Sequence, residues 1–164
     1  MAAELGILFM HYLLVALISY LGLILGAVLA FIAPEELKPG RKLLLLLKRA
    51  LFVAIFLFFI ILSGTEKVIV SVLLLVLAAV LVKYADGKVY YMVLGLLFYL
   101  SSAMMASFLV IASLIFCFGL PTGTLFVDRV FSEKKKNILV IIQRLVLHHL
   151  LFLAVALPLY FSNL

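Results

Sequence analysis

Residues 5–34 read LGILFMHYLLVALISYLGLILGAVLAFIAP, thirty consecutive positions without a charged side chain. A helix needs roughly 20 mostly apolar residues to cross about 30 Å of hydrocarbon, so this stretch is long enough for a membrane span. Other uncharged runs follow at 50–65, 68–82, 89–127 and 145–164. Since 69 % of the residues are hydrophobic and the mean hydropathy is +1.44, we predict a multi-pass integral membrane protein surrounded by the lipid bilayer.

The predicted fold class is an all-α polytopic helical bundle that forms a single domain over residues 1–164. Its longest polar connection, 121–137, is too short to fold independently. Pro34 marks the first break, and Ser63 and Glu66 have the spacing of a capping box that starts a new helix. Five transmembrane helices are expected, over residues 6–33, 43–63, 66–84, 89–119 and 138–161.

The stretch 89–119 is longer than an upright span requires. Two halves of about 15 residues would each be short for a crossing, and Ser101-Ser102 lacks the glycine or proline typical of a reversal. We therefore predict one long, tilted helix that ends at Pro121. The mixed apolar and charged segment 125–137 is then expected to lie on the membrane surface as an amphipathic segment.

The distribution of Lys and Arg predicts the orientation. With five spans, one side holds seven of them, within 38–49 and at Lys83 and Lys88, and the other holds five. This balance places the N-terminus outside and puts Lys38 and Lys134 on opposite sides of the membrane. The second basic group conflicts with the positive-inside rule. An even number of spans between the two groups would remove that conflict, so four and six spans stay open as alternatives.

Small residues recur at intervals of four in the first expected span, at Gly22, Gly26 and Ala30. This spacing lets two helix backbones approach closely, which favours helix–helix association. The face is predicted to pack against a neighbouring helix. That neighbour can belong to the same chain, to a second copy in a homo-oligomer or to a partner membrane protein.

Polar side chains in the last expected span indicate a candidate ligand or substrate site, formed by Gln143, Arg144, His148 and His149. Buried polar groups are costly unless they find partners, so such residues within a span point to function. In a five-span bundle the first and last helices start in the same leaflet, which would bring His11 close to Arg144 and His148. His149 points to another face and is expected to matter less than His148.

Several chemistries lack support in the sequence. Phosphate loops, dinucleotide-binding fingerprints, HExxH and GxSxG motifs are absent, and apart from Glu66 at the start of the third expected span, no Asp or Glu lies inside an expected span. The net charge of +6 flanks apolar runs and does not form a soluble basic groove, so nucleic-acid binding is not predicted. Because no metal-ligand spacing occurs, we predict no metal and no cofactor.

The leading hypothesis is a non-enzymatic membrane subunit or scaffold that packs against itself or a partner. The alternative is a small transporter or channel for a neutral or anionic solute, which would use Arg144 and the histidines. A membrane enzyme, or a protein that binds haem or copper through His11, His148 and His149, comes third.

Overall fold

The structure, a computed structural model, describes residues 2–62, 68–84, 87–133 and 138–161; the expected capping box lies outside these ranges. The described residues are helical almost throughout and contain no strand, which confirms the predicted all-α fold class. The helices are α1 (Ala2–Ile32), α2 (Pro34–Leu62), α3 (Val68–Tyr84), α4 (Gly87–Ser101), α5 (Met105–Glu133), α6 (Ile138–His149) and α7 (Leu151–Phe161).

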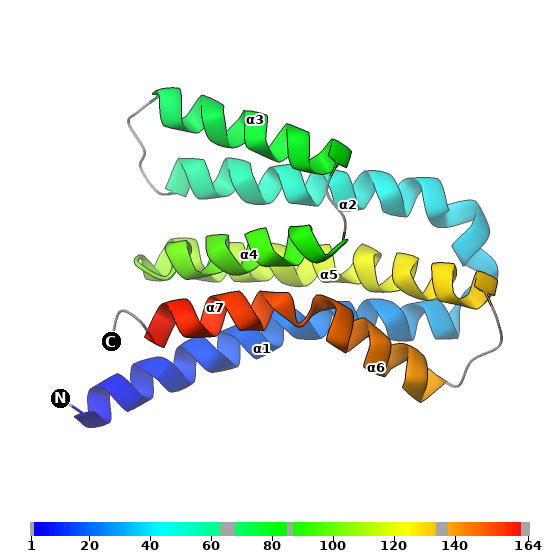
Figure 1. Ribbon diagram of the computed structural model, residues 1–164, viewed down its shortest axis with the longest axis horizontal. Helices are drawn as coiled ribbons and strands as arrows, with labels where there is room; N and C mark the ends of the chain where they lie inside the picture. The colour runs from blue at the N-terminus through cyan, green and yellow to red at the C-terminus, as the bar shows by residue number, and fades with distance from the viewer. Residues whose placement is uncertain (1, 63–67, 85–86, 134–137, 162–164) are drawn as a thin grey trace.

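These helices form an antiparallel bundle in which each pass reverses the direction of the one before (Figure 1). α6 and α7 follow one another as a single bent pass, so the termini lie at the same end of the bundle. The most extensive helix contact is that of α1 with α5, while α3 sits at the edge and packs on α2. The core between them is rich in fully buried aromatic side chains, which are Tyr91, Phe52, Phe56, Phe98, Phe118 and Phe152.

The prediction of one long helix over 89–119 is wrong. The chain turns at residues 102–104 and separates α4 from α5, which run in opposite directions. The hydroxyls of Ser101 and Ser102 donate to the carbonyls of Phe98 and Tyr99 at 2.8 and 2.6 Å, and Ser107 donates to Met104 at 2.8 Å. Serine side chains thus supply hydrogen bonds at this reversal, which therefore needs neither glycine nor proline.

The predicted helix end at Pro121 is also wrong. α5 continues to Glu133, so most of the expected surface segment 125–137 belongs to this helix, and residues 134–137 lie outside the described ranges. Proline removes one backbone donor from a helix. The hydroxyls of Thr122 and Thr124 donate to the Phe118 and Leu120 carbonyls, one turn back, each at 2.9 Å. These side chains thus add hydrogen bonds to the helix around Pro121.

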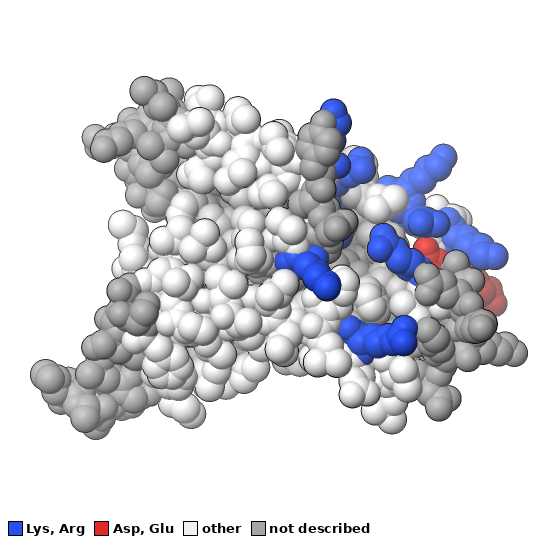
Figure 2. Space-filling view, in the orientation of Figure 1, with Lys and Arg blue, Asp and Glu red and all other residues white. Residues whose placement is uncertain are grey.

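The reversal at 102–104 changes the predicted placement of the basic residues. Arg41 of the first group lies with its Nε 3.7 Å from Oδ2 of Asp128, which is the neighbour of Arg129 in the second group. The two groups therefore lie at the same end of the bundle, contrary to the five-span expectation; Lys134 itself falls outside the described residues. Figure 2 shows Lys and Arg side chains gathered at that end. An even number of passes between the groups, the condition behind the four-span and six-span alternatives, accounts for this arrangement.

The last expected span, 138–161, is bent. α6 and α7 meet at an angle of 43° around Leu150. Nδ1–H of His149 donates to the Leu145 carbonyl at 2.8 Å, and the Tyr20 hydroxyl donates to the Val146 carbonyl at 2.7 Å. Side chains that engage helix carbonyls are a known cause of such bends.

Glycines form the contact between α1 and α5. A Cβ atom at Gly22 or Gly26 would strike the backbone of Phe116 or Leu120, and Gly119 and Gly123 face α1 equally closely. The Thr124 hydroxyl also donates across the contact to the Gly26 carbonyl at 2.8 Å. The first two members of the small-residue face therefore lie against another helix of the same chain.

Within the described part of the chain, three helical segments are long and apolar enough to cross a membrane: Phe9–Ile32, Pro34–Leu62 and Met105–Val130. The bent pair formed by α6 and α7 makes a fourth if it counts as one span. Ser71–Lys83 and Lys88–Ser101 are apolar but shorter.

Candidate functional site

Lys48 is the starting point of the candidate site. It lies halfway along α2 and is half-buried. Except for Arg49, the residues within one turn before and after it in the helix are apolar. Its Nζ atom lies 4.8 Å from the centroid of the Tyr90 ring and 5.8 Å from that of Phe118. Aromatic faces attract a cation but do not neutralise its charge. Among the described ion pairs, no carboxylate is a partner of the Lys48 ammonium.

That charge borders a small polar cavity of about 110 Å³ at the basic end of the bundle. Three helices build it: α2 supplies Arg41 and Lys48, α5 supplies Thr122 and Arg129, and α6 supplies the two histidines. The complete lining is Arg41, Leu45, Lys48, Thr122, Leu125, Phe126, Arg129, His148 and His149. We call this cavity the basic pocket.

Positive charge exceeds negative charge around the basic pocket. Lys48 and Arg129 both line the cavity, so two like charges border the same small space. Within the described ranges, the recorded ion pair at the pocket joins Arg41 to Asp128, and Arg41 remains well exposed to the surroundings. Like charges brought together are unfavourable unless an opposite charge offsets them. The arrangement is thus suited to holding an anion.

The two histidines are arranged differently around the pocket. His149 is 2 % exposed, and its Nδ1–H donates to the Leu145 carbonyl. Its ring stands edge-on to that of Tyr91, with the two ring centroids 4.6 Å apart. Because a carbonyl oxygen only accepts, Nδ1 carries the proton and Nε2 is the remaining polar atom. His148 is half-buried, with its ring centroid 4.9 Å from that of His149. His149, expected to matter less, is therefore the more enclosed of the two.

Two of the sequence-predicted site residues, His148 and His149, line the basic pocket. Arg144 is exposed and lines an adjoining cavity together with His148, whereas Gln143 is exposed and lines neither. These residues belong to α6, which contacts α1, α4 and α5.

The predicted approach of His11 to Arg144 and His148 is wrong. The hydroxyl of Tyr12, the next residue, donates to the Ala156 carbonyl of α7 at 2.9 Å, while Tyr20 reaches Val146 of α6. His11 thus lies about nine residues, or roughly 13 Å of helix, from the level of His148. The reason is the additional chain reversal, which makes the last pass antiparallel to α1 instead of parallel.

Sequence reasoning missed the residues that α2 and α5 contribute, chiefly Lys48, Thr122 and Arg129. One signal was available: Lys48 and Arg49 interrupt an otherwise apolar stretch over residues 43–62. Thr122 and Arg129 could not be assigned while α5 was expected to end at Pro121.

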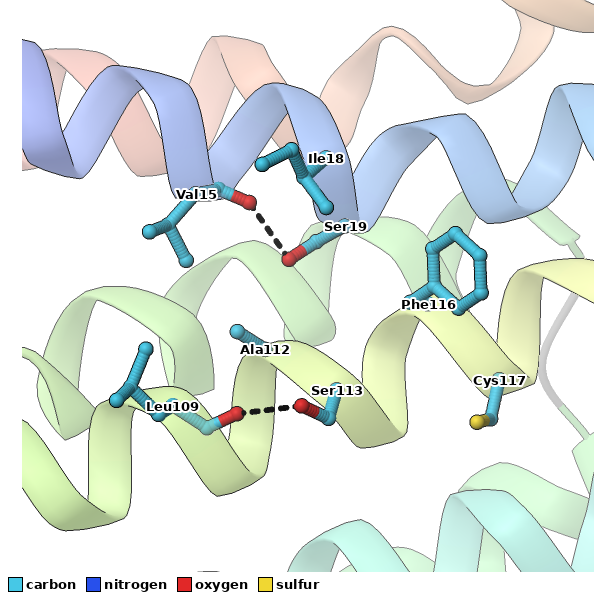
Figure 3. A pocket seen from close by; sticks show the side chains of 8 residues that line it. All are labelled: Val15, Ile18, Ser19, Leu109, Ala112, Ser113, Phe116 and Cys117. Atoms are coloured by element: carbon cyan, nitrogen blue, oxygen red, sulfur yellow. Dashed lines mark hydrogen bonds between the residues drawn. The ribbon is translucent and has the colours of Figure 1, made fainter.

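A larger groove of about 340 Å³ lies on the outer surface between α1 and α5 (Figure 3). Ser19 and Ser113 supply its hydroxyls, and these donate to the Val15 and Leu109 carbonyls of their own helices at 2.8 and 2.9 Å. The groove therefore offers mainly apolar contacts, and its polar groups are already engaged. It lacks the charge that distinguishes the basic pocket.

Among the described side chains, no group of three His, Cys, Asp or Glu residues comes together as metal ligands would. No protein-family model, curated protein or solved structure matches the chain.

Proposed function

We propose that this protein is a small, non-enzymatic polytopic membrane protein that binds an anion of the phosphate or sulfate class in the basic pocket. The observation that carries the proposal is the convergence of Arg41, Lys48 and Arg129, from two helices, with two histidines of a third on one cavity of about 110 Å³. Such a cavity has room for a tetrahedral oxyanion and a few water molecules.

The chemistry of the lining favours an oxyanion over a neutral solute. Guanidinium groups donate two parallel hydrogen bonds to phosphate or carboxylate oxygens, and Lys contributes a point charge. The Lys48 ammonium is supported by aromatic rings and not by a carboxylate in the described ion pairs. A bound anion would offset the like charges of Lys48 and Arg129.

Binding is supported better than conduction through the bundle. Beyond the pocket the core is filled by large side chains that are less than 2 % exposed, among them Tyr91, Phe98 and Phe152. These rings pack on their neighbours; for example, the centroids of Phe98 and Phe152 are 5.4 Å apart. We therefore assign the protein to anion recognition at one end of the bundle.

The glycine face gives less support to a scaffold that associates with itself. Gly22 and Gly26 are in backbone contact with α5, so this face is already covered by the same chain. Because the positive-inside rule places clustered Lys and Arg in the cytoplasm, we propose that the basic pocket opens on the cytoplasmic side. With six passes, both termini would lie on the opposite side.

Calorimetric titration of the detergent-solubilised protein with sodium phosphate and sodium sulfate tests the proposal. We expect saturable binding of both anions, weakened about tenfold or more by Lys48→Met or Arg129→Gln, since a charge-assisted contact contributes about 1.5–3 kcal/mol. Lys42→Met is the matched control, because Lys42 is exposed and does not line the basic pocket. Binding that is equal in all variants, or absent in the wild type, would contradict the proposal.

A further inference from the structure

A second cavity adjoins the basic pocket. Its volume is about 390 Å³ and it is open to the surface. Phe126 and His148 line both cavities and form the boundary between them. A ligand that fills both would pass beside these two side chains.

The second cavity differs from the first in character. Val130 of α5 and Leu147 of α6 give it an apolar wall, and Leu147 is 63 % exposed. Lys88 and Arg144 also line it, so cations accompany its apolar surface. α6 diverges from α5 toward the basic end of the bundle (Figure 1). We call this cavity the side groove.

We propose that the anion bound in the basic pocket is the phosphate group of a lipid, whose hydrocarbon chain lies along the side groove. This inference rests on the proposed function, because it assigns a substrate class to the same pocket. Lys48 and Arg129 would hold the phosphate, while Val130 and Leu147 would contact the chain. Lys88 and Arg144 would stand near the polar backbone of the lipid.

Two observations favour a lipid-borne phosphate over a free one. The polar cavity has room for little more than the phosphate group, so the bulk of a larger ligand must lie in the adjoining apolar space. That space opens on the flank of the bundle, between helices whose exposed side chains are hydrophobic, as at Leu139 and Leu147. In a membrane this flank would meet lipid, so a lipid could enter both cavities without leaving the bilayer.

The test compares ligands that share a phosphate and differ in their apolar part: inorganic phosphate, glycerol 3-phosphate, dihexanoyl phosphatidic acid and dioctanoyl phosphatidic acid. Binding is measured by calorimetry with the full chain in detergent, and dioctanoylglycerol, which has the same chains and no phosphate, serves as the control for partition into micelles. We expect affinity to rise from glycerol phosphate to the dioctanoyl lipid by about tenfold or more, since each fully buried methylene favours binding about fourfold.

Two substitutions in α6 test whether the hydrocarbon chain of the lipid lies in the side groove. Leu147→Trp should fill the side groove and remove the gain from chain length, while leaving inorganic phosphate binding unchanged. Leu139→Trp is the matched control, because Leu139 is exposed on the same helix and lines neither cavity. Equal affinity for all the phosphates, with no effect of Leu147→Trp, would overturn this inference and leave anion binding intact. Binding of neither phosphate nor phosphatidic acid would overturn both.

Discussion

At the scale of single residues, Lys48 is the residue on which the proposed anion site depends most. A cation enclosed by aromatic rings loses hydration, and cation–π attraction of about 0.5–2 kcal/mol recovers part of that loss. Stability alone would favour an uncharged side chain of similar shape at this position. A lysine at this position is therefore consistent with the proposed anion ligand, which would supply the missing opposite charge.

Lys48→Met should therefore separate stability from binding. In the absence of anions, we expect the variant to be as stable as the wild type or more stable by about 1 kcal/mol, because a poorly hydrated charge is removed. Thermal unfolding in anion-free detergent buffer measures this difference. A loss of stability of about 1 kcal/mol or more would instead identify Lys48 as a structural residue and contradict its assignment to a ligand.

At the scale of helices, the contact of α1 with α5 organises the molecule. The two helices approach so closely that a side chain at Gly26 would meet the Leu120 backbone. That contact continues through the turns of α5 on both sides of Pro121, with Gly119 and Gly123 facing α1. Helix packing thus maintains α5 past a residue that usually ends a helix, and this carries Thr122 and Arg129 to the basic pocket.

A pair of glycine substitutions tests this contact. Gly26→Ala should destabilise the protein by about 1–3 kcal/mol, because backbone cannot move aside as a flexible side chain can. Gly40→Ala, in α2, is the matched control: a Cβ there meets nothing within 4 Å, and alanine favours helix by about 0.5–1 kcal/mol. Equal unfolding midpoints for both variants in detergent would show that α1 and α5 are not in close contact.

At the scale of the whole molecule, the turn at 102–104 determines which residues share an end of the bundle. We predict that cysteines placed at Lys38 and Arg129 in a Cys117→Ser background react with a membrane-impermeant reagent from the same side. A cysteine at Ala103, which is exposed in the turn, should react from the opposite side. Labelling of intact cells or sealed vesicles provides the measurement. Opposite-side labelling of positions 38 and 129 would restore the five-span arrangement.

The sequence was sufficient to predict the fold class and the helical nature of the chain, because long uncharged runs permit little else. Its interpretation failed at Ser101 and Ser102, where hydroxyl groups support a turn without glycine or proline, and at Pro121, where packing outweighs a local helix breaker. Because of these two errors, the residues that α2 and α5 contribute to the basic pocket were not predicted. His148 and His149 were identified as polar residues within an apolar helix, but their partners on α2 and α5 depend on the direction of each pass.

The central claim, that the basic pocket binds an anion, is tested most directly by the histidines themselves. The chain has three, of which His148 and His149 line the pocket and His11 is exposed on α1, about 13 Å along the bundle from their level. The measurement is ¹⁵N NMR of histidine-labelled protein during titration with inorganic phosphate, assigned with His11→Gln. We predict that the ring resonances of His148 and His149 shift along one saturation curve while that of His11 stays in place. Unmoved His148 and His149 resonances, or equal shifts of all three, would contradict the account.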